Sequence, residues 1–140
     1  LQQSHYSEPH TWNKDAPAVK KMMRTPNTYG YFTATYTPIK PLSIALSGTY
    51  TGSMLVPHEP VPGFHENPIT VNTKDFFDIG LKAAYDFKLY KSMNLQINAG
   101  IQNIFNAYQD DFDKGADRDS GYIYGPSLPR SFFAGVKISY

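Results

Sequence analysis

The fold of this chain is decided by residues 77–88, which read FDIGLKAAYDFK. Every second residue of this stretch is apolar or aromatic: Phe77, Ile79, Leu81, Ala83, Tyr85 and Phe87. The opposite parity carries all of its charged residues: Asp78, Lys82, Asp86 and Lys88. Because successive side chains of a β-strand point to opposite faces, this alternation predicts a strand with one apolar and one polar face.

Four further runs of the chain alternate in the same way or are rich in β-branched and aromatic residues. We therefore expect five antiparallel strands, at residues 27–36, 42–53, 75–87, 93–105 and 130–140. Three long irregular stretches precede or separate them, at residues 1–26, 55–72 and 106–128, and we expect loops there. Residues 55–72 contain four prolines, which argue against a central strand or a helix.

Strand length and loop rhythm favour a transmembrane β-barrel. The five runs are about twice as long as the ~5–6 residues of an average soluble strand and match the ~9–11 residues that cross a bilayer. Long and short connections alternate, as in outer-membrane barrels, which have short turns on one side and long extracellular loops on the other. Charged residues avoid the parity of the large aliphatic side chains, where a charge facing lipid near the midplane costs about 2–4 kcal/mol. We predict an all-β fold, an antiparallel transmembrane β-barrel.

A soluble β-sandwich or a lipocalin-like barrel, acting as a binding module, is the alternative, because its strands also alternate between a buried and a solvated face. Five strands of this length cannot close a barrel, so we expect further strands before Leu1 to complete it. The chain opens Leu-Gln-Gln, without Met or an apolar leader, and we interpret it as a segment of a longer polypeptide. No run of about 18 apolar residues is present, which excludes a spanning helix.

Composition excludes several classes of function. The formal net charge is +1 and basic residues do not cluster, so we expect no nucleic-acid partner. Without cysteine there can be no disulfide scaffold, thiolate metal site or cysteine nucleophile. The sequence lacks a nucleophile elbow and a phosphate-cradling glycine loop, so we predict neither an enzyme nor a bound cofactor.

The sharpest motifs lie in the last third of the chain. Residues 100–108 read GIQNIFNAY, residues 124–126 read YGP and residues 129–135 read PRSFFAG. These segments resemble the C-terminal end of TonB-dependent outer-membrane receptors. In that family an Asn-x-Phe-Asn/Asp segment followed by Tyr commonly ends the penultimate strand, and Pro-Arg or Gly-Arg opens the last strand, which ends on an aromatic residue. The Asp-rich residues 109–120, together with residues 24–31 and 48–52, resemble a Bacteroidetes-type subgroup.

The resemblance implies a receptor of about 22 strands with a plugged lumen, to which this chain supplies the C-terminal strands. Such a receptor binds a scarce ligand, an iron chelate (siderophore), a vitamin or a glycan, and imports it across the bacterial outer membrane. The TonB–ExbB–ExbD complex supplies the energy through an N-terminal part which, like the plug domain, lies outside this segment. Further expected partners are outer-membrane lipid, the barrel-assembly machinery and a surface lipoprotein. A passive porin or an outer-membrane enzyme barrel is the alternative function within the same fold.

The resemblance also gives the last strand a role and a location. It implies a signal for the barrel-assembly machinery, carried by four residues of one parity: Phe132, Val136, Ile138 and Tyr140. The C-terminus is then expected in the periplasm, on the side of the short turns. Arg130 is expected to fix the start of this strand rather than to bind a ligand.

Aromatic and histidine side chains of the three long loops are the candidate ligand-binding residues: Trp12, His58, Phe64, His65, Tyr108, Tyr122 and Tyr124. Aromatic rings can stack on a chelate or on sugars, although membrane anchoring and loop packing use the same side chains. His58 and His65 share one loop, which permits a metal- or haem-contacting site, but no fixed ligand spacing supports it.

The acidic loop raises a calcium hypothesis through Asp111, Asp113 and Asp117, because Ca²⁺ prefers carboxylate oxygens. With Asp111 at position 1 of an EF-hand loop, however, Gly115 falls at position 5 instead of 6. Tyr122 then stands at position 12, where the motif requires Glu. We therefore expect a solvated loop whose aspartates pair with Lys114 and Arg118, and no metal site.

Overall fold

The chain consists of strands and connecting loops. The computed structural model describes all residues, Leu1–Tyr140, and they form two compact units. The long strands make one sheet: β3 (Tyr29–Ile39), β4 (Leu42–Thr51), β7 (Phe76–Lys88), β8 (Asn94–Gln102) and β9 (Ser131–Ser139). The chain has no helix that is long and apolar enough to cross a membrane.

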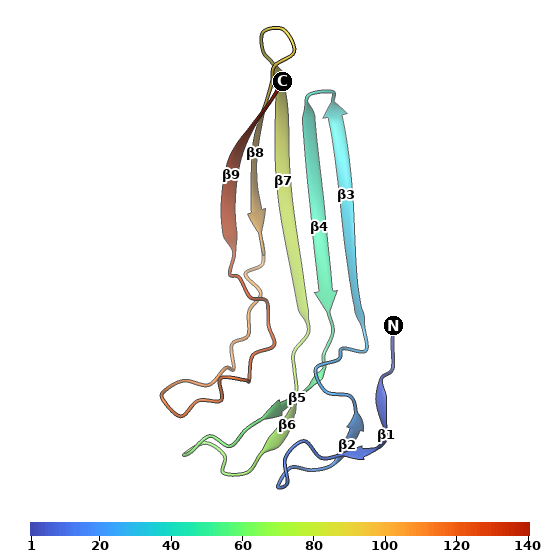
Figure 1. The fold of residues 1–140 in the computed structure, drawn as a ribbon, viewed down its shortest axis with the longest axis vertical. Coiled ribbons are helices and arrows are strands. Elements are labelled where there is room, and N and C mark those ends of the chain that lie inside the picture. Colours follow the sequence, from blue (N-terminus) through green and yellow to red (C-terminus); the bar gives the residue numbers. More distant parts are fainter. The chain divides into compact units, whose positions relative to one another are not determined.

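Neighbouring strands of this sheet follow the order β3-β4-β7-β8-β9 and alternate in direction (Figure 1). The predicted all-β, antiparallel class is therefore confirmed. Each strand begins and ends within three residues of its predicted range. The sheet is open, because β3 and β9 each have only one neighbouring strand.

The register of the last three strands aligns their apolar residues into rows. Tyr85 pairs with Ile97, and Ile97 pairs in turn with Val136. Three more rows have the same character: Leu81-Ile101-Phe132, Ala83-Ala99-Ala134 and Phe87-Leu95-Ile138. Two of the intervening rows are polar: Asp86-Gln96-Lys137 and Lys88-Asn94-Ser139. Since paired residues project to the same side, this part of the sheet has one apolar and one polar face.

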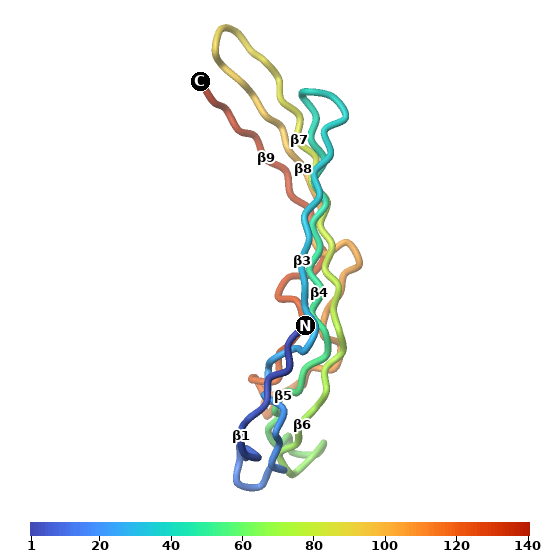
Figure 2. The backbone as a smooth tube through the Cα atoms, turned by 90° about the vertical axis from the view of Figure 1, so that its right-hand side faces the viewer, coloured from blue at the N-terminus to red at the C-terminus, as the bar shows by residue number.

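The apolar face of this sheet is exposed. Figure 2 shows the long strands as a single layer. Phe132 is 78% exposed, Val136 66% and Ile138 61%, whereas the one buried hydrophobic residue of this unit is Ala84. The sheet therefore has almost no core of its own.

Two glycines let aromatic rings lie against the sheet. The ring of Phe32 occupies the space beside Gly48 that a Cβ would need, and the ring of Phe133 does the same at Gly100. A Cβ at Gly100 would also lie 2.5 Å from the carbonyl oxygen of Leu81. Phe133 pairs with Gly100 on the parity opposite the apolar rows, so it is an aromatic ring on the otherwise polar face.

The second unit contains two short hairpins that the sequence does not predict. β1 (His5–His10) pairs with β2 (Val19–Lys21), and β5 (Leu55–His58) pairs with β6 (Ile69–Asn72). The expectation of strand-free loops at residues 1–26 and 55–72 is therefore wrong, whereas residues 106–128 contain no strand. Pro57 is tolerated in β5 because each strand of a two-stranded hairpin has a free edge, where a missing N–H breaks no ladder.

Most of the buried apolar side chains lie in this second unit. They come from the hairpins, from the start of β7 and from the loop that follows β8: Ala16, Leu55, Val56, Val61, Phe76, Tyr122 and Tyr124. Val56 of β5 is only 1% exposed. This small core holds the loop against the β5–β6 hairpin and positions the polar cluster described next.

Candidate functional site

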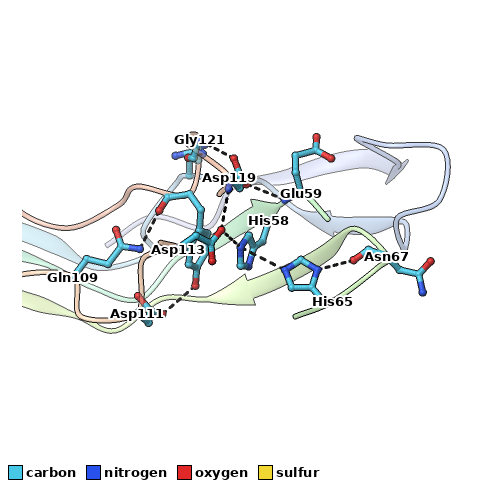
Figure 3. Close-up of polar contacts among 11 residues, drawn as sticks. His58, Glu59, His65, Asn67, Gln109, Asp111, Asp113, Asp119 and Gly121 are labelled. Carbon is cyan, nitrogen blue, oxygen red and sulfur yellow. Dashed lines mark hydrogen bonds and ion pairs between the residues drawn. The ribbon is translucent and has the colours of Figure 1, made fainter. Parts of the chain in front are cut away.

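The cluster is built around His58, the last residue of β5, whose ring is almost completely buried. Its Nε2 atom lies 2.8 Å from Oδ2 of Asp113, which belongs to the loop after β8 (Figure 3). Both side chains are more than nine-tenths buried, so the contact is shielded from water. An imidazole and a carboxylate that are buried together satisfy each other's hydrogen-bonding groups. Leaving either group buried and unpaired would cost free energy.

Tyr122 forms the wall of this cluster. Its ring stacks on the His58 ring, with centroids 3.8 Å apart and planes inclined by 6°. Its hydroxyl donates to Oδ2 of Asp111 at 3.0 Å. Tyr124 donates to the other oxygen of the same carboxylate at 2.5 Å, so Asp111 accepts hydrogen bonds from two tyrosines.

The environment of Asp111 sets the charge state of these three groups. Burial raises the pKa of Asp111, but hydrogen bonds from Tyr124 and Tyr122 oppose this and bring the pKa below its ordinary value. Burial, and then the hydrogen bond to Asp111, raise the pKa of Tyr122 to about 12. The pKa of Tyr124 is raised for the same two reasons. At neutral pH the carboxylate is therefore ionised and both hydroxyls keep the protons that they donate.

Gln109 locks the two tyrosines into place through the backbone. Its side-chain amide donates to the carbonyl oxygen of Tyr122 at 3.0 Å and accepts from the backbone N–H of Tyr124 at 3.0 Å. Gln109 is buried, and Gly125 lies so close to it that a Cβ there would be 2.8 Å from the Gln109 nitrogen. Through these two hydrogen bonds the loop folds back on itself as a compact arch between Gln109 and Gly125.

Arg24 and Asp119 fasten this arch to the rest of the unit. The Arg24 guanidinium donates to the carbonyl oxygens of Gly121 at 2.6 Å and Ile123 at 3.2 Å. Asp119 accepts from the backbone N–H of Glu59 at 2.9 Å, and its own N–H donates to Asp113 at 3.1 Å. Figure 3 shows the contacts of Asp119 with Glu59 and Asp113 beside His58.

His65 completes the cluster from the loop between β5 and β6. Its Nδ1 lies 2.9 Å from the carbonyl oxygen of Asn67, and its Nε2 lies 3.5 Å from Nε2 of His58. The two rings meet edge to face, with centroids 4.4 Å apart. The ring of Phe64 lies beside His65 at 5.7 Å.

The structure brings together four of the predicted ligand-binding residues, His58, His65, Tyr122 and Tyr124, but mostly as packing partners of one another. His58, Tyr122 and Tyr124 are buried, so in this structure their rings are not open to a ligand. Phe64 and Tyr108 are the exposed candidates, at 79% and 55%. Trp12 is half-buried, and its indole N–H has no hydrogen-bond partner in the chain.

The predicted pairing of the aspartates with Lys114 and Arg118 is wrong. Arg118 donates to the carbonyl oxygen of Gly115 at 3.0 Å, and the ammonium of Lys114 lies 6.0 Å from the Phe112 ring. The loop's one lysine–aspartate pair joins Asp110 to Lys74, at 2.6 Å. Asp111 instead accepts from the hydroxyls of Tyr122 and Tyr124. Asp113 contacts the His58 imidazole and accepts from the backbone N–H of Asp119.

The calcium candidates do not converge on one point. Asp111 faces two tyrosines, Asp113 faces His58, and Asp117 is exposed. No group of three or more histidine, aspartate or glutamate side chains is arranged to hold a metal ion.

Sequence reasoning missed Gln109, Asp119 and Arg24 as members of the cluster. Their contacts span between 2 and 99 positions along the chain, and no periodic pattern connects them. Comparisons with protein-family models, with curated proteins and with solved structures found no match to this chain.

Proposed function

We propose that this chain forms part of the wall of an outer-membrane β-barrel, with the long sheet in the bilayer and the second unit as its extracellular loops. The observation that carries the proposal is the exposed apolar face of the sheet, with its aligned rows of large side chains. Contiguous apolar surface of this extent is rare on a soluble monomer and marks contact with lipid or with another protein surface.

The distribution of charge supports lipid as the partner of that face. Every charged residue of β7, β8 and β9 lies on the opposite parity: Asp78, Lys82, Asp86, Lys88 and Lys137. A soluble sandwich also has an apolar face, but it needs a second layer of structure to cover it. This chain places its buried side chains in the loop unit instead.

The two open edges support a larger barrel. β3 and β9 each present one row of backbone groups without a neighbouring strand. In hydrocarbon an unsatisfied backbone group costs several kcal/mol, so both edges must be paired with further strands. We infer that these strands come from the remainder of a larger barrel.

The connections at the ends of the strands support an orientation in which the long loops are extracellular and the short turns are periplasmic. Within the sheet, the connections β3–β4 and β7–β8 are short turns, around Lys40 and Lys91, whereas the connections from β4 to β7 and from β8 to β9 are long. Tyr85, Phe87 and Tyr90 lie near the β7–β8 turn, where an interfacial aromatic girdle would lie. The short turns and the C-terminus would then face the periplasm.

Active import is the function that we propose for the whole protein, and it rests on the resemblance of residues 100–135 to TonB-dependent receptors. The motif residues have a clear structural task here. Asn103 is buried and bonds to Ala107 and Leu128, and Asn106 accepts from the backbone N–H of Arg130 at 3.0 Å. These contacts set the geometry in which the last strand begins, which gives a physical reason for such residues at this place.

The proposal includes a scarce ligand bound from outside, an iron chelate, a vitamin or a glycan, and energy from the TonB–ExbB–ExbD complex. Exposed rings of the second unit, Phe64 and Tyr108, are the side chains that we propose for ligand contact. Both present an aromatic surface suited to stacking.

A matched pair of substitutions tests the orientation of the sheet. Leu81→Arg places a charge on the apolar face and should block assembly of the full-length protein, while Lys82→Leu on the adjacent polar position should be tolerated. The measurement is heat modifiability on gels, which separates folded from unfolded barrels. Equal behaviour of the two variants would contradict the proposal.

A second experiment separates a plugged receptor from a porin. The full-length protein is reconstituted into liposomes, and swelling in arabinose is recorded. We expect swelling no faster than in empty liposomes, because a plugged lumen does not pass a small sugar freely. Swelling at the rate of a general porin would favour the passive alternative.

A further inference from the structure

The contact between His58 and His65 has a defined pattern of protons. Nδ1 of His65 lies 2.9 Å from the carbonyl oxygen of Asn67. A carbonyl oxygen only accepts, so Nδ1 carries the hydrogen. In neutral His65 the Nε2 atom is therefore bare, and its lone pair points at His58.

His58 has the opposite tautomer. Its Nε2 faces the carboxylate oxygen of Asp113 at 2.8 Å, and an ionised carboxylate also only accepts. The hydrogen of His58 is therefore on Nε2. That N–H is donated to Asp113, and the bare Nε2 of His65 lies 3.5 Å from the same nitrogen. No two hydrogens therefore oppose each other while His65 is neutral.

The surroundings provide a counter-ion for one positive charge only. Asp113 faces His58, and the Tyr122 ring, whose hydroxyl is bound to Asp111, covers the other side. Phe64 is the ring beside His65. The nearby carboxylates have other partners: Asp119 binds the Glu59 N–H, and the Glu59 side chain accepts from Asn13. No hydrogen bond or ion pair joins Glu66 to either imidazole.

We propose that this histidine pair is a proton-operated latch, closed at neutral pH and opened by mild acid. A first proton on His58 strengthens its contact with Asp113. A second proton, on Nε2 of His65, sets N–H against N–H across 3.5 Å between two positive rings. Histidine takes up protons over this pH range, so acid drives the His65 ring away while His58 stays bound.

The part released is the tip of the β5–β6 loop. His65 closes this tip through backbone hydrogen bonds with Val61, at 2.9 and 3.0 Å. Between them lie Gly63, with φ of 79°, and the exposed ring of Phe64. Opening therefore changes the presentation of the most exposed aromatic side chain in this loop. The latch rests on contacts within the second unit, so its failure would leave the barrel proposal untouched.

Hydrogen exchange with mass spectrometry tests the latch in the full-length protein in detergent. Exchange is measured at about pH 7.5 and at about pH 5. The labelling times are corrected for the difference in intrinsic exchange rate between these two pH values. A peptide covering residues 59–67 should lose about tenfold in protection at the lower pH, while peptides from β7 and β8 should keep theirs. Unchanged protection of the tip would overturn the proposal.

Three variants assign the effect to the pair. His65→Gln removes the second charge, and His58→Gln keeps a donor for Asp113 but leaves only one titrating ring, so both should abolish the pH dependence. His5→Gln, an exposed position in β1, should preserve it. Protection of the β7 and β8 peptides reports that each variant is folded. Persistence of the pH dependence in His65→Gln or His58→Gln would contradict the latch.

Discussion

Asn103 illustrates how one side chain can terminate a strand. It follows β8 with φ of 49°, a left-handed conformation that asparagine adopts more readily than most residues. Its side-chain oxygen accepts from the Ala107 N–H at 2.7 Å, and its amide nitrogen donates to Ala107 and Leu128. One buried amide thus closes the turn and ties it to the segment that leads into β9.

Asn103→Ala should destabilise the protein by about 1–3 kcal/mol, because it leaves the partners of a buried amide unsatisfied. The measurement is urea unfolding of the full-length protein in lipid vesicles. Asn94→Ala is the control, since Asn94 is exposed and its side chain bonds only to the Ser92 carbonyl oxygen, at 3.3 Å. Equal unfolding midpoints for the two variants would show that the amide has no such role.

Tyr124→Phe should raise the pKa of Asp111, because it removes a hydrogen bond that lowers this pKa against the effect of burial. A carboxyl whose pKa is lowered on folding stabilises the fold above its ordinary range, about pH 4, and loses this contribution as pH falls through the folded value. In the variant this loss begins at a higher pH. Carboxyl ¹³C NMR of labelled aspartate follows the titration, with Tyr108→Phe as the control in the same loop. An unchanged titration in Tyr124→Phe would show that the hydroxyl does not set this pKa.

The candidate site was predictable by residue type but not by arrangement. Histidines and tyrosines in polar loops mark candidates because they carry rings, protons and hydroxyls. The pairing of His58 with Asp113, 55 positions away, depends on how the two loops fold. No periodic pattern in the sequence specifies the fold of these loops. The burial of Tyr122 and Tyr124 could not be predicted from the sequence pattern either, because it depends on the arch that Gln109 closes.

At the level of elements, the long strands were predictable because each repeats the same two-residue period over many residues. β1 (His5–His10) and β5 (Leu55–His58) are short, contain proline and alternate weakly, so composition indicated loops. Their pairing within hairpins provides the stabilisation that local propensity lacks. In this chain β3 and β9 each have one neighbouring strand.

Gly100→Val should prevent correct pairing of β7, β8 and β9. The added side chain would collide with the Phe133 ring and with the backbone oxygen of Leu81. A mobile ring can move, but the backbone of a paired strand cannot, so the folded fraction in heat-modifiability gels should fall strongly. Gly30→Ala is the control, because nothing lies within 4 Å of the added Cβ. Normal folding of Gly100→Val would show that the strands tolerate a wider spacing here.

At the scale of the whole molecule, the two units differ in how they bury apolar surface. The loop unit has its own small core around Val56, whereas the sheet exposes its apolar rows and buries little more than Ala84. A sheet of this kind becomes stable only when lipid or another protein surface covers its apolar face. Sequence alternation predicted the two faces, but it could not decide between lipid and a protein core, because both require the same pattern.

The most direct measurement is the environment of two adjacent residues on β9. Val136 lies in an apolar row and Lys137 in a polar one. Val136→Cys and Lys137→Cys are spin-labelled in the full-length protein in lipid bilayers, and collision rates with oxygen and with a water-soluble nickel chelate are compared. We predict that oxygen dominates at position 136 and the nickel chelate at position 137. Inaccessibility of position 136 to both reagents, or dominance of the nickel chelate at both positions, would contradict a lipid-facing sheet.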